Sequence, residues 1–201
     1  MWTFPMSEIR YCIAVAFVCL VPGVFVYWFS IHPFVNFWRR VGAGRTVGLH
    51  LAFMGLIALI VSTQRSWLIA VEFESHLWLY VAGGGLMALS AVLRKRLGWE
   101  LRLSTLLGFP EVDPARYPQP LLTGGPYAHV RHPRYLQLTL AFWAWALLAN
   151  YLAAYVLAAL ALAGIRLVVH WEERELRTRY GAAYREYELR VPRFIPRFHK
   201  Q

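Results

Sequence analysis

The sequence has 201 residues, enough for one ordinary domain, but 58% of them are apolar and nine are tryptophan. This composition excludes an ordinary soluble domain and favours a membrane protein. The net charge of +10 is typical of nucleic-acid-binding proteins only when the basic residues share one soluble face. Here they cluster between long uncharged runs, as expected beside lipid headgroups. We therefore expect membrane lipids, and no nucleic acid, as partners.

Three uncharged runs in the first half predict membrane-spanning helices at about 11–31, 46–64 and 75–93. Each run is close to the roughly 20 apolar residues that cross about 30 Å of hydrocarbon. A secretory signal peptide is the alternative for the first run, because Arg10 precedes it. The run is too long for one, and no small-residue cleavage site follows it.

Small residues within these spans indicate packing rather than chemistry. Cys12 and Cys19 lack the partners for a disulfide framework or a metal site, so we expect no bound metal. The glycines of a nucleotide-binding loop directly follow a β-strand, whereas no strand is predicted before Gly83–Gly85. Close packing of two helices is therefore their expected role.

The next uncharged run, 135–165, is too long for one comfortable crossing, so a hairpin of two helices is predicted at about 133–149 and 151–175. Asn150 supplies a polar turn near its middle. The predicted fold is therefore all-α and polytopic, with about five transmembrane helices. Residues 1–93 would form the N-terminal helices, and residues 94–201 the region with the candidate chemistry.

The charges predict which way these helices cross the membrane. With five spans, one side carries most of the basic residues, namely Arg39, Arg40, Arg45, the 94–134 linker and the C-terminal tail. The other side has Arg10 and Arg65 beside acidic residues. The positive-inside rule then places the C-terminus in the cytoplasm and the N-terminus outside, as in a bacterial inner membrane.

The connector at 121–135 is a candidate anion site. Pro133 stands where a helix is expected to begin, so His132 would flank a helix N-terminus. The free N–H groups and dipole there favour a carboxylate or phosphate, and Arg131 would strengthen that preference. The alternative is that Arg131 and Arg134 only anchor the helix at the headgroups.

The hairpin would bring Glu172 and Glu173 close to His132. Ionisable residues at the end of a span are functional candidates because their burial is costly. Arg166, His170 and Glu173 share one helical face, while Glu172 lies about 100° around the helix. A pocket with cations on one wall and a carboxylate on another suits a zwitterionic ligand such as an amino acid moiety.

The remaining chain predicts an interfacial helix and a lid. Leu176, Tyr180, Tyr184 and Tyr187 repeat at helical spacing among charges, which indicates an aromatic membrane anchor rather than a cofactor site. The two prolines in 190–197 predict an extended segment that folds back as part of a lid.

These segments resemble the isoprenylcysteine carboxyl methyltransferase family and its bacterial and archaeal relatives, including phospholipid methyltransferases. The resemblance covers roughly 119–197 and rests on residues 125–135 (GPYAHVRHPRY), Glu172-Glu173, residues 181–184 (GAAY) and residues 190–192 (RVP). It implies S-adenosylmethionine as cofactor, in a cytoplasmic pocket formed by the 94–134 linker, the last hairpin and the C-terminal segment. Matched by position, the implied cofactor contacts are Leu121, Leu122, Tyr127, His132, Pro133, Arg134, Tyr135 and Glu172.

The acceptor side departs from the family pattern. Many members carry an arginine four residues before the first glutamate, where this chain has Val168, and Arg166 is the nearest cation. A carboxylate or thiolate acceptor needs no general base, whereas an amine or phenol would need one, with His170 or His129 as candidates. We take Arg166 and His170 as the candidate catalytic residues.

The predicted function is methyl transfer from S-adenosylmethionine to a lipophilic or membrane-embedded acceptor, such as an isoprenylcysteine carboxylate or another small lipid or thiol. One alternative is a sterol-type membrane reductase that uses NADPH. The other is a noncatalytic membrane protein whose basic linkers hold anionic lipid.

Overall fold

The computed structural model describes residues 6–98 and 108–196, and the regular structure in these ranges is helical apart from one isolated bridge. The other residues, which include parts of the 94–134 linker and of the tail, lie outside the described ranges. The elements are α1 (Met6–Ile31), α2 (Val35–Val41), α3 (Ala43–Thr63), α4 (Arg65–Leu68), α5 (Leu77–Leu97), α7 (Phe109–Val112), η2 (Gly125–Ala128), α8 (Pro133–Ala149), α9 (Leu152–Tyr180) and α10 (Ala182–Arg190).

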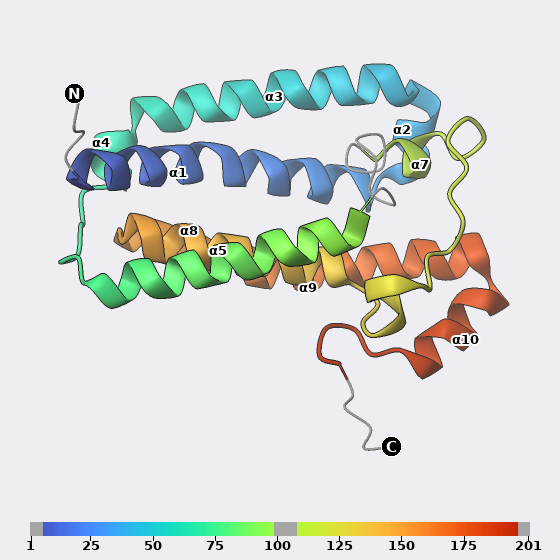
Figure 1. Ribbon diagram of the computed structural model, residues 1–201. Helices are drawn as coiled ribbons and strands as arrows, with labels where there is room; N and C mark the ends of the chain where they lie inside the picture. The colour runs from blue at the N-terminus through green and yellow to red at the C-terminus, as the bar shows by residue number, and fades with distance from the viewer. Residues whose placement is uncertain (1–5, 99–107, 197–201) are drawn as a thin grey trace, which may run out of the picture.

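The long helices form one bundle (Figure 1). α1 packs against α3 on one side and against α8 and α9 on the other, while α5 packs along α8. α2, α7, η2 and α10 gather at one end of the bundle, and α4 lies at the opposite end (Figure 1). The predicted all-α architecture is confirmed.

Four helices, α1, α3, α5 and α9, are long and apolar enough to cross a membrane. Their positions agree with four of the predicted spans to within a few residues. The fifth predicted span is α8, a helix of 17 residues, and its crossing of the membrane stays a prediction. The outer face of α3 bears exposed apolar side chains, whereas its buried residues are Thr46 and His50. Apolar residues outside and polar residues inside are what a lipid environment favours.

The predicted hairpin turn lies at Asn150. α8 ends at Ala149, and Asn150 adopts a left-handed conformation with φ of 58°, which asparagine tolerates better than most residues. Its side-chain amide donates to the carbonyl of Glu74 at 2.9 Å. The buried Arg10 also donates to the carbonyl of Ala149 at 3.1 Å, so the hairpin tip is tied to both α1 and the loop before α5.

Only Gly83 of the three consecutive glycines allows a close helix contact. A Cβ atom at Gly83 would lie 2.9 Å from Cγ of Leu148 on α8, whereas one at Gly84 or Gly85 would meet nothing within 4 Å. The packing interpretation is therefore confirmed for Gly83. Glycine there lets α5 approach α8 closely near the hairpin turn.

Candidate functional site

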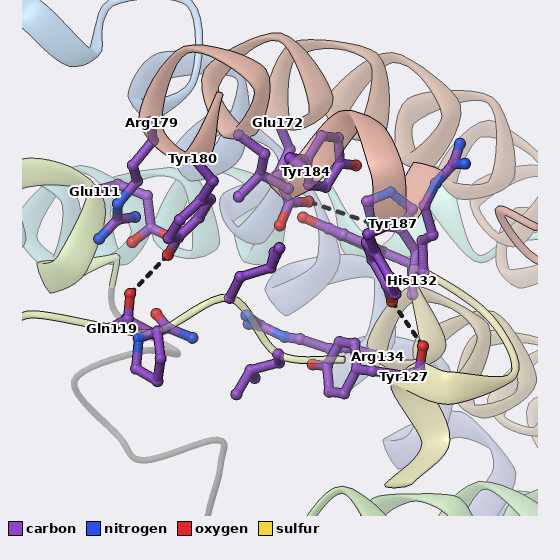
Figure 2. A pocket seen from close by; sticks show the side chains of 16 residues that line it. Glu111, Gln119, Tyr127, His132, Arg134, Glu172, Arg179, Tyr180, Tyr184 and Tyr187 are labelled. Atoms are coloured by element: carbon purple, nitrogen blue, oxygen red, sulfur yellow. Dashed lines mark hydrogen bonds and ion pairs between the residues drawn. The ribbon is translucent and has the colours of Figure 1, made fainter. Parts of the chain in front are cut away.

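A cavity lies where the end of α9 meets the connector before α8 and the helix α10 (Figure 2). Its polar lining comes from α7, the connector, α8, α9 and α10, segments far apart in the sequence. The lining side chains are Glu111, Gln119, Pro120, Leu121, Leu122, Tyr127, Arg131, His132, Arg134, Tyr135, Glu172, Leu176, Arg179, Tyr180, Tyr184 and Tyr187.

The charged end of α9 and the helix α10 form one wall. α9 stops at Tyr180 because Gly181 takes a positive φ of 56°, and α10 starts in a new direction. Tyr184 and Tyr187 are buried, and with Leu176 and Tyr180 they line the cavity. The prediction of an aromatic membrane anchor is wrong, because the break at Gly181 turns this stripe inward.

Glu173 joins three segments behind the cavity. Its side chain is 1% exposed, and Arg131 donates to its Oε1 at 2.8 Å. Nε of Arg193 donates to both carboxylate oxygens, at 2.9 and 3.0 Å, and Nε2 of His132 lies 3.2 Å from Oε1. Buried carboxylates need such partners, so Glu173 fixes the connector and the C-terminal segment to α9.

The C-terminal segment folds back onto the connector. The backbone N–H of Arg131 donates to the carbonyl of Pro192 at 2.8 Å, and that of His132 donates to the carbonyl of Arg193 at 3.1 Å. The predicted fold-back is confirmed for residues 191–196, but the predicted extended conformation is wrong, because this segment bends repeatedly and forms no strand. Arg197 lies outside the described residues.

Glu172 lies next to this cluster but faces the cavity. At about 100° per residue, Glu172, Leu176 and Arg179 share the face of α9 that lines the cavity. Oε2 of Glu172 is buried and has no hydrogen-bond partner among the described residues. Nδ1 of His132 lies 3.8 Å away, beyond hydrogen-bond distance. The two neighbouring glutamates therefore differ, since both carboxylate oxygens of Glu173 are paired, whereas Oε2 of Glu172 has no hydrogen-bond partner among the described residues.

The structure brings most of the predicted cofactor residues together. Those that line the cavity are Leu121, Leu122, Tyr127, His132, Arg134, Tyr135 and Glu172. Pro133 does not line it. It is buried as the first residue of α8, the position that the sequence predicts.

Arg166 and His170 lie elsewhere. Both are exposed on α9, and neither lines the cavity. Both side chains lie on the same face of α9 as Glu173. The connector and the C-terminal segment cover this face at Glu173, but not at Arg166 or His170. His129 is exposed as well. The structure does not bring these residues to the cavity, and their catalytic roles stay predictions.

Arg134 is the cation best placed at the cavity. Its guanidinium lies over the ring of Trp28, 5.7 Å from the centroid, and none of the described acidic side chains forms an ion pair with it. A guanidinium without an acidic partner can donate hydrogen bonds to the carboxylate of a ligand. Arg131, by contrast, is held by Glu173 and by the carbonyls of Glu188 and Val191.

Three further lining residues, Glu111, Gln119 and Arg179, belong to none of the predicted motifs. Glu111 lies on the single turn α7, whose position in space depends on packing against α2. Burial raises the pKa of Glu111 to about 7, and the negative charge of Glu172 adds to this shift. The one local signal for Glu111 is that it is an acidic residue within the short apolar segment Phe109–Val112.

Comparisons with known proteins show what the chain is similar to. The model of the phospholipid methyltransferase family matches residues 78–183, more than half of the chain. Methanethiol S-methyltransferase 2 and methanethiol S-methyltransferase 1 of Bradyrhizobium diazoefficiens are each 40% identical to the chain over 88 residues, or 43% of its length. The aligned part covers 31% and 28% of these two relatives. No solved structure matches the chain.

Proposed function

The chain belongs to the phospholipid methyltransferase family, and from that membership we propose that it transfers a methyl group from S-adenosylmethionine to a small or lipophilic acceptor at the membrane. The buried, unpartnered Oε2 of Glu172 carries the proposal. A buried carboxylate oxygen needs a donor, and the ammonium and hydroxyl groups of S-adenosylmethionine are donors of the right kind.

The charges around the cavity suit the two ends of an amino acid moiety. Glu172 offers a carboxylate to its ammonium, and Arg134 offers a guanidinium to its carboxylate. His132 is less suited to that second task, because its ring lies between Glu172 and Glu173 and its backbone N–H is used by the C-terminal segment. We assign His132 to positioning the two glutamates.

Tyrosines supply the wall for a flat aromatic group such as adenine. Tyr184 and Tyr187 are buried, and the hydroxyl of Tyr187 donates to the carbonyl of Tyr127 at 2.7 Å. Burial raises the pKa of Tyr187 to about 12, so this hydroxyl keeps its proton at neutral pH. The aromatic wall is therefore fixed to the connector.

When bound, S-adenosylmethionine supplies a methyl group on a positively charged sulfonium. The chain's own residues need only align the reacting pair and exclude water. Glu172 and Arg134 hold the two ends of the ligand at fixed positions. The pairing of Glu173 with Arg193 keeps the C-terminal segment over the connector and so limits the entry of water.

We propose a thiol as the first acceptor to test. The two similar proteins are by name methanethiol S-methyltransferases, and methanethiol is a small thiol. Many members of the isoprenylcysteine carboxyl methyltransferase family carry an arginine at the position of Val168. Val168 is uncharged and fully buried, so this position offers no cation to an acceptor carboxylate. This departure argues against a prenylcysteine carboxylate as acceptor.

The first experiment measures binding. Purified protein in detergent is titrated with S-adenosylhomocysteine by calorimetry, and we expect Glu172→Gln and Arg134→Ala each to weaken binding about tenfold or more. Glu186→Gln is the matched control, because that side chain is 73% exposed on α10. Absence of binding by folded wild-type protein would overturn the proposal, and binding of NADPH instead would favour a reductase.

The second experiment identifies the acceptor. Membranes with and without the protein are incubated with radiolabelled methyl donor and with ethanethiol, and the methylated product is identified by chromatography.

We also propose that the site faces the cytoplasm. A fluorescent protein fused to the C-terminus should then fluoresce, whereas a periplasmic phosphatase fused there should be inactive.

A further inference from the structure

We propose that Glu111 accepts the proton of the acceptor's nucleophile, which makes a thiol that is still protonated at neutral pH the preferred class of acceptor. This inference rests on the proposed methyl transfer. It concerns a residue of α7 that lines the cavity beside Arg179 and Tyr180 (Figure 2).

One carboxylate oxygen of Glu111, Oε2, is not used to hold the fold. Arg39 donates to its backbone carbonyl at 3.0 Å, and Arg179 donates to the carbonyl of Pro110 at 3.0 Å. Both arginines thus anchor the backbone of α7, and the described residues provide no ion pair to the side chain. Oε2 of Glu111 is buried without a hydrogen-bond partner in this part of the chain.

Gly108 allows the turn before α7 to pack closely against α1. It has a φ of 65°, and a Cβ there would lie 2.9 Å from the hydroxyl oxygen of Tyr27 and 3.7 Å from Oε2 of Glu111. Only a residue without a Cβ fits this close to Tyr27 in this backbone conformation. Gly108 therefore helps to fix α7, and with it Glu111, at the wall of the cavity.

Glu111 also borders a small hollow beside the cavity. This hollow, of about 20 Å³, shares Glu111, Arg134, Tyr135 and Glu172 with the cavity. Its remaining wall comes from Tyr27, Trp28 and Ile31 of α1, from His32 directly after that helix, and from Gly108. The hollow has room for about one water molecule, so a small acceptor would lie in the cavity itself, where Glu111 forms part of the wall.

The surroundings of Glu111 explain why it can act as a base. The titratable and charged groups that face it are Tyr27 of α1, His32 directly after α1, Arg39 of α2, Arg134 and Tyr135 of α8, and Glu172, Glu175, Arg179 and Tyr180 of α9. Burial, followed by the field of Glu172, raises the pKa of Glu111 to about 7. A base is most effective when its pKa lies near the working pH.

The step balances as follows. The S–H bond of the acceptor breaks as its proton moves to Glu111, and the sulfur lone pair forms a bond to the methyl carbon. The bond between that carbon and the donor sulfonium breaks, and its electron pair leaves the donor sulfur as a neutral thioether. The proton on Glu111 then passes to solvent, which restores the carboxylate.

The test compares two acceptors. Ethanethiol is protonated at neutral pH, whereas pentafluorothiophenol is already ionised. We expect Glu111→Gln to lower kcat/KM for ethanethiol about 100-fold and to leave that for pentafluorothiophenol within threefold. Glu111→Asp should restore part of the ethanethiol rate, and Glu186→Gln should change neither.

Two further measurements keep the inference separate from the proposed function. Calorimetry should give the same affinity for S-adenosylhomocysteine in Glu111→Gln as in wild type, to within threefold. Infrared difference spectra should show a carboxyl band that titrates near pH 7 in wild type and is missing in Glu111→Gln.

Equal losses with both thiols, or an unchanged rate with ethanethiol, would overturn the role of Glu111. Lack of S-adenosylhomocysteine binding by wild type would instead overturn the proposed function. If Glu111→Gln fails to fold, Glu111→Asp decides, because it should slow transfer to ethanethiol and spare pentafluorothiophenol. Equal effects of Glu111→Asp on the two thiols count against the inference.

Discussion

Arg131 and Glu173 form a buried ion pair in which Nη2 of the arginine lies 2.8 Å from Oε1 of the glutamate. The two residues are 42 positions apart, on opposite sides of the α8–α9 hairpin. Their pairing closes the hairpin at its charged end, as Asn150 closes it at the turn. The neighbouring Glu172 is thereby left facing the cavity.

Glu173→Gln should strongly destabilise the protein. The substitution leaves the guanidinium of Arg131, which is 8% exposed, without its carboxylate, and breaking a buried pair in this way costs about 3–5 kcal/mol. The free energy of unfolding in mixed micelles measures the effect, and Glu186→Gln is the exposed control. A loss below 1 kcal/mol would mean that the C-terminal segment holds its place by other contacts.

Gly83→Val should push α5 away from α8. The added Cβ would lie 2.9 Å from Cγ of Leu148, so we expect a loss of about 1–3 kcal/mol in the same measurement. Gly84→Val tests the reason, because nothing lies within 4 Å of a Cβ at Gly84. If both variants lose the same amount, helix propensity rather than close packing is responsible.

The stability of wild type should depend on the ionisation of Glu111. Its folded pKa is raised to about 7 by burial and by Glu172, so its contribution is fully present below the ordinary pKa of a carboxyl group and is lost as the pH rises through about 7. Between pH 5 and pH 8 wild type should lose about 2 kcal/mol relative to Glu111→Gln. Parallel pH curves for the two proteins would contradict this expectation.

Tyr187→Phe should weaken binding of S-adenosylhomocysteine about fivefold, because it removes one hydrogen bond worth about 1 kcal/mol between α10 and the connector. Calorimetry at neutral pH measures the change. Tyr11→Phe, at the other end of the bundle, is the control and should bind as wild type does. Unchanged binding by Tyr187→Phe would show that packing alone holds the aromatic wall.

Several features of the fold could be predicted from local patterns. Uncharged runs predicted α1, α3, α5 and α9, since the cost of placing charge in hydrocarbon makes such runs informative by themselves. Pro133 and Asn150 predicted the two ends of α8, because each favours a particular backbone conformation. The motif around His132 and Glu172 predicted seven of the sixteen residues that line the cavity.

Other features depended on packing between distant segments. Arg166, His170 and Glu173 share a helical direction, but only Glu173 is covered, because only there do the connector and the C-terminal segment cross α9. The tyrosines of α10 turn inward because Gly181 changes the direction of the chain by an amount that no periodicity encodes.

The sequence by itself determined the class of protein, the main helices and the residues that resemble a methyltransferase, since hydropathy, proline and charge act locally or along one helix. The tertiary structure alone decided which of two adjacent glutamates is paired and which faces the cavity. It also decided that Glu111, on a single helical turn, lies beside them. Burial and pairing are properties of neighbours in space, and these neighbours are separated by tens of residues in the chain.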